Sequence, residues 1–136
     1  MDFVFPTLKQ VLLLHDRTIV MHGGSQGIKD IGLVESALFG AQQTFGGQDL
    51  YPTLASKAGA LWHGLVCNHG FVDGNKRIGL IVVSTFLRMN GFKLDLTQSK
   101  AEEITLEMAS SQISRQILIQ MIEGFIVPLN DKPSNG

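Results

Sequence analysis

Apolar side chains recur three and four positions apart along most of the chain, which predicts a series of amphipathic helices. The first run opens at Thr7, a residue type suited to capping a helix, and stops at the glycine pair 23–24. The second run opens at another capping residue, Asp30, and reaches about Gly40. The N-terminal third of the chain is therefore expected to form two helices separated by a glycine-rich loop.

The third and fourth runs form the most apolar part of the chain. Pro52 suits the first turn of the third helix, and the apolar stripe of that helix leads on to His69. The fourth run, about Asn75 to Asn90, is apolar on nearly every side. Because a helix without a polar face must be covered on all sides, we expect it to be central and buried.

Two shorter runs complete the pattern, one opening at Thr97 and one at Ser111 or Ser114. We therefore predict a single all-α domain, residues 1–127, built as a compact bundle of about six helices. Residues 128–136 are expected to form a flexible polar tail. The sequence contains no convincing strand pair and no internal repeat.

Residues 41–51 interrupt the helical pattern with an irregular segment that holds two adjacent glycines and two aromatic residues, Phe45 and Tyr51. Irregular segments of this length in small domains often carry function, and this one could clamp a target protein. Alternatively, it is a plain surface loop whose aromatic side chains are tucked into the core.

Composition narrows the possible functions. The chain has 136 residues, of which 44% are hydrophobic, so it is long enough and apolar enough to form a core. Eleven Lys and Arg against twelve Asp and Glu argue against direct DNA binding over a broad basic surface. No apolar run reaches the ~18–20 residues of a membrane span. A single cysteine makes the cytoplasm the expected location.

Candidate chemistry is concentrated in residues 67–77, directly before the most apolar helix. The N-terminus of a helix presents unpaired N–H groups and the positive end of the helix dipole, which together attract anions. Lys76 and Arg77 add two cations there, and Gly74 lets the backbone approach a ligand closely. A bridging Mg²⁺ would reconcile Asp73 with a bound phosphate, and His69 could serve as a general base.

Structural interpretations of the same residues remain open at this point. Asp73 could simply cap the fourth helix, and His69 could be a core histidine that continues the apolar stripe of the third. Lys76 and Arg77 could be solvated surface residues. Yet cations in a first turn oppose the helix dipole, and local rules are most often broken at functional sites.

Residues 69–77, His-Gly-Phe-Val-Asp-Gly-Asn-Lys-Arg, resemble the Fic/Doc superfamily signature His-x-Phe-x-Asp/Glu-Gly-Asn-Gly/Lys-Arg. The segments 23–38, 43–47 and 50–54 are similar to the N-terminal half of the death-on-curing (Doc) branch, so the resemblance covers about residues 8–125. It implies the all-helical Fic fold and transfer from a nucleoside triphosphate to a protein hydroxyl.

The resemblance also implies roles for individual residues. His69 matches the family's general base, and Asp73 matches its magnesium ligand. The residues that match its phosphate-holding loop are Gly74, Asn75, Lys76 and Arg77. The implied cofactors are Mg²⁺ and ATP, or another nucleoside triphosphate as donor.

Two positions are similar to the Doc branch rather than to the AMP-transferring Fic enzymes. Lys76 stands where those enzymes usually carry glycine, and Leu80 stands at their second arginine. The resemblance therefore implies a kinase-like toxin that transfers the terminal phosphate, with elongation factor Tu as the expected target and a separate antitoxin as inhibitor. Physically, a lysine side chain in place of glycine would change how the triphosphate lies.

Two other functions remain as alternatives, a Fic-type AMP transferase and a non-catalytic binding module. Gly70, where many relatives carry proline, favours the module because glycine loosens the backbone beside His69. The self-inhibitory pattern Ser/Thr-x-x-x-Glu-Gly/Asn is absent, since Ile119 stands four residues before Glu123-Gly124. Inhibition is therefore expected to come from another chain.

The other histidines and the cysteine are weaker candidates. His15, His22 and His63 have no metal-ligand partners at helical spacing, and we interpret them as structural or surface residues. Cys67 has no evident activating partner other than His69, which argues against a thiol nucleophile.

Overall fold

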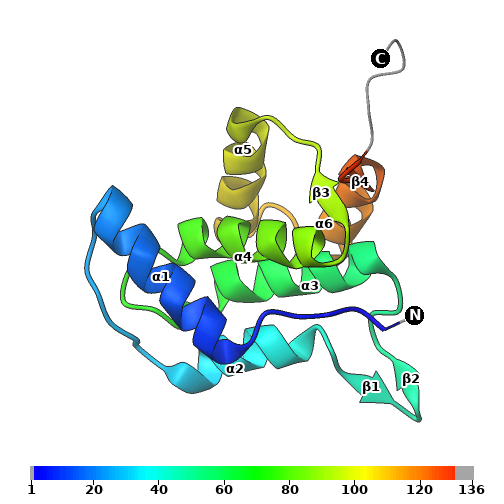
Figure 1. Cartoon of the computed structure of the whole chain (residues 1–136), viewed down its shortest axis with the longest axis horizontal. Helices are drawn as coiled ribbons and strands as arrows, with labels where there is room; N and C mark the ends of the chain where they lie inside the picture. The colour runs from blue at the N-terminus through cyan, green and yellow to red at the C-terminus, as the bar shows by residue number, and fades with distance from the viewer. Residues whose placement is uncertain (1, 131–136) are drawn as a thin grey trace.

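A computed structural model describes residues 2–130 of the chain, and its elements are drawn in Figure 1. The six helices of these residues confirm the all-α bundle. They are α1 (Leu8–His22), α2 (Ile31–Gly40), α3 (Leu54–Cys67), α4 (Asn75–Met89), α5 (Gln98–Ala109) and α6 (Arg115–Ile122), with a short 3-10 helix, η1 (Glu123–Phe125), after α6. In this part of the chain, no helix combines the length and the apolar character that a membrane crossing requires.

Most of the helices begin where the sequence places a capping side chain. Thr7 caps α1, Asp30 caps α2 and Thr97 caps α5, each by accepting a hydrogen bond from a first-turn N–H group. Ser114 rather than Ser111 caps α6. The start of α3 differs slightly from the prediction, because Thr53 is its cap and Pro52 therefore lies just outside the helix.

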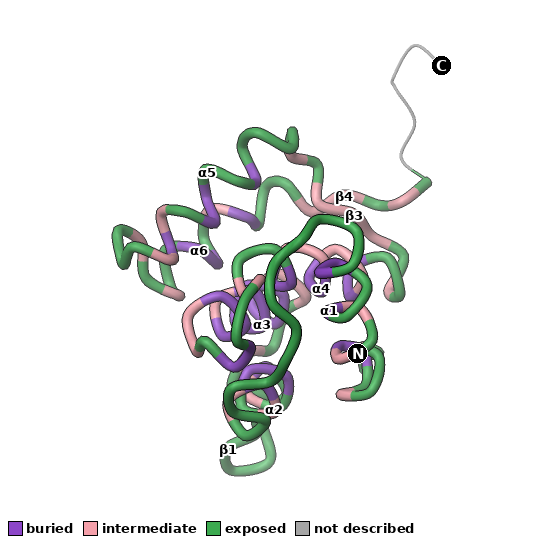
Figure 2. The backbone as a smooth tube through the Cα atoms, turned by 90° about the vertical axis from the view of Figure 1, so that its left-hand side faces the viewer, coloured by how far each residue is buried: buried purple, intermediate pink, exposed green. Residues whose placement is uncertain are grey.

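The core lies around α3 and α4, which pack side by side through the centre of the molecule (Figures 1 and 2). Ile78, Val82 and Phe86 of α4 are fully buried, as is Trp62 of α3. Gly79 lets the two helices approach closely, since a Cβ there would lie 2.6 Å from a methyl carbon of Val66. α1 and α2 cover one side of this pair, and α5 and α6 cover the other.

The expectation that the chain has no strand pairs is wrong at two places. β1 (Thr44–Phe45) pairs with β2 (Gln48–Asp49), and β3 (Phe92–Leu94) pairs with β4 (Ile126–Pro128), both antiparallel. The first pair turns through Gly46 and Gly47, both with positive φ. Adjacent glycines at a two-residue turn are a hairpin signal, so the sequence did carry a sign of this element.

The predicted tail also needs correction at its start. Pro128 lies in β4 opposite Phe92, and the Leu129 N–H donates to the Gly91 carbonyl oxygen at 2.9 Å. Residues 128–130 are thus attached to the domain by backbone pairing with a segment about 35 positions earlier, a contact that local polarity does not reveal. Residues 131–136 of the predicted tail lie outside the described residues.

The hairpin formed by β1 and β2 lies apart from the motif of residues 69–77 (Figure 1). It joins the end of α2 to the start of α3, whereas residues 68–74 follow the end of α3. A helix of 14 residues separates the two segments by about 21 Å along its axis. Phe45 is 85% exposed and Tyr51 is half-buried, so only one of the two aromatic side chains packs against the core.

Candidate active site

Residues 68–74 connect α3 to α4, and backbone hydrogen bonds fix them against the segment that precedes α2. The Gly70 carbonyl oxygen accepts from the N–H groups of Lys29 and Asp30 at 2.9 and 3.0 Å. The Val72 N–H donates to the Gly27 carbonyl oxygen at 3.1 Å, and Ile28 forms a bridge with Phe71. The glycine-rich loop between α1 and α2 is therefore part of the same structure as the motif.

Gly70 permits this close contact. A Cβ at this position would lie 2.5 Å from the Val34 Cγ2 atom and 3.0 Å from the Val34 backbone nitrogen. Neither atom is at the end of a flexible chain, so a larger residue would push the loop away from α2. The glycine that suggested a loose backbone beside His69 instead lies in a tightly packed position.

Asp73 does not cap α4. One of its carboxylate oxygens accepts from the Gly74 N–H at 2.8 Å, and the other accepts from the Ser25 N–H at 3.0 Å. These two hydrogen bonds, with a smaller contribution from the Arg77 charge, hold the pKa of Asp73 below its ordinary value. The side chain is exposed and, by this pKa, ionised at neutral pH, so it can still offer lone pairs to a cation.

The N-terminus of α4 is left uncapped. Gly74 is the N-cap residue, with φ of +80°, and no side chain hydrogen-bonds to the first turn. The other five α-helices within residues 2–130 all have a side-chain cap. Because its first-turn N–H groups have no side-chain partner, α4 presents donors and a positive dipole end to a ligand. Lys76 and Arg77 are exposed at this same end.

His69 is not a core histidine. α3 ends at Cys67, and His69 adopts the left-handed region with φ of +54°, which turns the chain out of the helix and leaves the residue exposed. The imidazole has no hydrogen-bond partner among residues 2–130, unlike those of His15 and His63. Non-glycine residues rarely adopt this conformation, and such strain is most common at functional sites.

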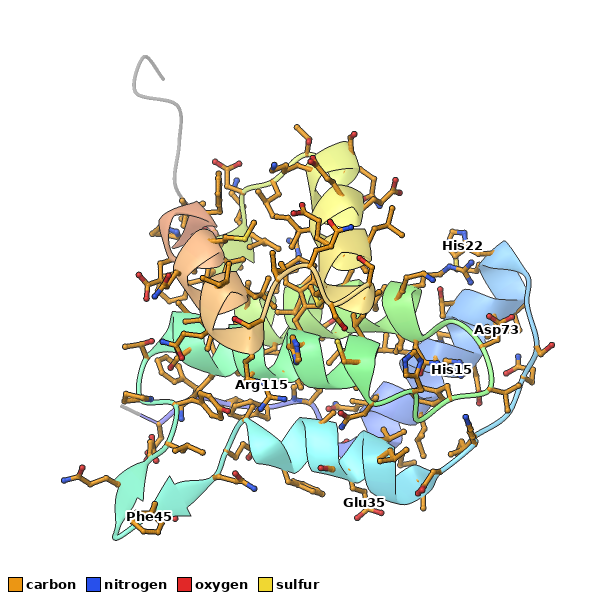
Figure 3. All side chains as sticks on the ribbon, turned by 180° about the vertical axis from the view of Figure 1, so that it is seen from behind. His15, His22, Glu35, Phe45, Asp73 and Arg115 are labelled. Atoms are coloured by element: carbon orange, nitrogen blue, oxygen red, sulfur yellow. The ribbon has the colours of Figure 1, made fainter. Side chains whose placement is uncertain are left out.

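His15 is the residue of the site that sequence reasoning missed. Its side chain is 1% exposed, and its Nε2–H donates to the Asp73 carbonyl oxygen at 2.7 Å. Its ring stacks on Phe71, with centroids 3.8 Å apart and planes inclined by 11°. His15 thus holds two residues of the loop from α1 (Figure 3). The sequence indicated that His15 is a structural or surface residue, but nothing local in the sequence indicated what it touches.

Asn75 and Arg77 also bind the backbone around the motif. The Asn75 side chain accepts from the Phe71 N–H and donates to the Phe71 carbonyl oxygen, both at 3.0 Å. Arg77 donates to the Gly23 carbonyl oxygen at 3.2 Å. Phe71 itself is 2% exposed and anchors the loop in the core. Asn75 keeps one amide hydrogen, and Arg77 keeps most of its donors, for a ligand.

These residues border an open cleft of about 1130 Å³ that runs from the motif along α4 to α5. His69, Asp73, Gly74, Asn75, Lys76 and Arg77 all line it, so the structure brings every predicted site residue together. Leu80 also lines the cleft, and it therefore presents an apolar side chain where a second arginine would add charge. His22 contributes to the lining from the end of α1.

Comparison with known proteins agrees with this arrangement. The sequence profile of the Fic/DOC family matches residues 5–87, which include α1 to α3, the loop and most of α4. The chain belongs to the Fic/DOC family. A Fic/Doc protein from Mycolicibacterium smegmatis, named Toxin Doc, is 36% identical to it over 108 residues, which cover 78% of this chain and 83% of that relative.

Cys67 lies beside the Fic/Doc motif but outside its chemistry. Its Sγ atom is 3.7 Å from Nε2 of His63 and contacts the Met108 carbonyl oxygen at 3.5 Å. Burial raises the pKa of the thiol. Because the thiolate is the nucleophilic form, a raised pKa argues against a nucleophilic role, as the sequence suggested. The neighbouring histidine is His63, however, and not His69.

Proposed function

We propose that this chain is a Doc-like toxin that transfers the terminal phosphate of ATP, or of another nucleoside triphosphate, to a hydroxyl of a target protein in the cytoplasm. The observation that supports this most directly is the uncapped N-terminus of α4, which shares one cleft with His69, Asp73 and two cations. The 36% identical relative named Toxin Doc supports the toxin class. Elongation factor Tu is the proposed target, by analogy with the Doc branch.

The phosphates would bind where α4 begins. The first-turn N–H groups, Lys76 and Arg77 supply donors and positive charge at one point, which suits the negative charge of a triphosphate. His69 would accept the proton of the target hydroxyl as its oxygen attacks the terminal phosphorus. The bond to the bridging oxygen then breaks, and the nucleoside diphosphate leaves with the charge held at α4.

Asp73 fits the role of a magnesium ligand. Each of its oxygens accepts only one hydrogen bond, so each keeps a lone pair, and the carboxylate is ionised at neutral pH. Within residues 2–130, no group of three or more His, Cys, Asp or Glu side chains could enclose a metal. Asp73 would therefore be the protein ligand, with phosphate oxygens and water completing the shell. The bound ion would neutralise charge on the phosphates.

Lys76 and Leu80 are the residues that bear on whether the terminal phosphate or AMP is transferred. Both line the cleft, one as a cation near the start of α4 and one as an apolar side chain a turn further along. An AMP transferase would have to hold the phosphates further along α4, beside position 80. Leu80 offers the phosphates no charge at that position. We therefore favour transfer of the terminal phosphate over transfer of AMP.

Inhibition is proposed to come from a separate antitoxin protein. The pattern by which many family members inhibit themselves is missing, because Ile119 occupies its Ser/Thr position. Ile119 is also 8% exposed and packs against Gly59 of α3, so it serves the core. Co-expression with the product of a neighbouring gene should therefore relieve toxicity.

Growth measurements test the toxin class and the role of His69. Induced expression of the chain in a bacterial host should arrest growth, and His69→Ala should restore it at equal protein levels. His22→Ala is the matched control, because His22 also lines the cleft but has no proposed role, and it should remain toxic. Intact-mass measurement of elongation factor Tu from arrested cells should show one added phosphate group. Growth arrest by His69→Ala would contradict the enzyme and favour a binding module.

A further inference from the structure

A second cavity lies away from the cleft, between α2, α3 and the start of α6. Its volume is about 130 Å³, room for a few water molecules or a small polar group. Its lining residues are Ser36, Ala37, Gly40, Gln43, Ala60, Asn68 and Arg115. Figure 3 shows Arg115 well separated from Asp73, and no residue of the described part of the chain lines both this cavity and the proposed phosphate site, although Asn68 is next to His69.

Arg115 brings an uncompensated positive charge to this cavity. Its Nη1 donates to the Tyr51 hydroxyl at 3.0 Å, but its Nε is shielded from solvent and has no hydrogen-bond partner. Arg115 forms no ion pair with any carboxylate of residues 2–130. An arginine is always charged, and a shielded donor without a partner destabilises the folded state. A bound anion would balance the guanidinium charge through the Nη hydrogens that Tyr51 leaves free.

The rest of the lining is neutral and rich in donors. Ser36 supplies a hydroxyl, Gln43 supplies an amide, and no Asp or Glu lines the cavity. Asn68 is held in place by donating to the Leu33 carbonyl oxygen at 3.1 Å. His63, close to Arg115, has its pKa lowered by burial and by the Arg115 charge, so it adds no second positive charge at neutral pH.

We propose that this cavity is a binding site for a carboxylate group. One guanidinium charge balances one carboxylate, and the planar pair of guanidinium donors fits the two oxygens of a carboxylate. The small volume and the single cation fit a monoanion better than a phosphate, which would bring a second negative charge without a partner. The carboxylate can come from a free small acid or from an acidic side chain of a polypeptide.

Titration of the ¹⁵N-labelled chain with sodium acetate tests the proposal. The Nε–H signal of Arg115, assigned by its loss in Arg115→Lys, should shift and saturate. Sodium chloride at the same ionic strength should leave it in place, and inorganic phosphate should shift it less than acetate. A signal that does not move with acetate, or moves equally with chloride, overturns the carboxylate site.

A carboxylate introduced into the cavity by substitution gives a second test, which does not require a variant of Arg115. Gln43→Glu replaces an amide of the lining with a carboxylate of the same shape, so it should raise the melting temperature and abolish the acetate shift. Gln48→Glu is the matched control, because it adds the same charge five residues further along, in β2 and outside the cavity. Equal melting temperatures and equal acetate responses for the two variants would contradict the proposal.

Two capped peptides distinguish the sources of the carboxylate. Ac-Leu-Glu-Leu-NH₂ should displace acetate, and Ac-Leu-Gln-Leu-NH₂ should not. Binding of the glutamate peptide at least tenfold tighter than acetate assigns the site to a partner polypeptide, and equal affinities assign it to a free small acid. If neither peptide nor acetate shifts the Arg115 signal, the site is refuted.

Discussion

The residues of the candidate site act through backbone geometry as much as through side chains. His69 and Gly74 both adopt positive φ, one at the end of α3 and one at the start of α4. Between them the chain reverses direction, so the imidazole and the first-turn N–H groups of α4 border the same cleft. A loop of this kind depends on the conformational freedom of glycine at position 74.

Gly74→Ala should therefore destabilise the fold. A left-handed conformation costs a non-glycine residue about 1–2 kcal/mol. The added Cβ would also lie 3.1 Å from the Ile19 Cδ1 atom. Urea unfolding should show a loss of about 1–2 kcal/mol, and Gly124→Ala, at an open position, should change stability far less. Equal stability of Gly74→Ala and the wild type would contradict the structure of the loop.

Asp73 predicts a defined pH dependence of stability. Its pKa is lowered in the folded state, so the ionised carboxylate stabilises the fold above the ordinary aspartate pKa of about 3.9. This contribution disappears as the pH falls through the lower folded-state pKa. The unfolding free energy of wild type minus that of Asp73→Asn should thus be constant between about pH 5 and 7 and shrink below about pH 4. A difference that grows on acidification would rule out this role.

At the scale of elements, the site is assembled from two parts of the chain that are remote in sequence, residues 8–30 and residues 68–89. The motif follows α3, α4 supplies the anion site, α1 supplies His15, and residues 24–30 pair with the loop. The pairing explains why the glycine-rich loop before α2 forms part of the site. Gly24 lies so close to the Asp73 carboxylate that a Cβ there would meet its Oδ2 atom at 2.7 Å.

His15→Phe tests the support from α1. Phenylalanine can still stack on Phe71, but the Asp73 carbonyl oxygen loses its donor, and the loss of a typical hydrogen bond costs about 1 kcal/mol. Phosphoryl transfer should fall as well, because Asp73 and Gly74 are no longer fixed. His22→Phe, on the exposed end of the same helix, is the control. The explanation fails if both variants have the same stability and activity.

The sequence predicted most of the elements, because helix caps and apolar spacing act locally. Thr7, Asp30 and Thr97 cap helices as expected. The β3–β4 pair was missed because its strands are three residues long and their pairing is non-local. The roles of Asp73 and His15 in holding the loop were missed for a similar reason, since each depends on a partner more than 45 positions away.

At the scale of the whole molecule, the cleft and the carboxylate cavity lie on different sides of the central helices. Arg115 and Asp73 are well separated in Figure 3, and among residues 2–130 none lines both cavities. Substitution of Arg115 should therefore leave phosphate binding unchanged, whereas substitution of Asn68, which is next to His69, can affect both sites. The motif predicted the first site, whereas the second depends on Arg115, Gln43 and Asn68 meeting in space.

The most direct test of the central claim is transfer of label from ATP. The purified chain, with Mg²⁺ and elongation factor Tu, would be incubated with ATP labelled at either the α or the γ phosphorus, and His69→Ala would be the control. The account predicts label from the γ position alone, lost in the variant. Label from the α position would make the chain an AMP transferase and contradict the role given to Lys76 and Leu80.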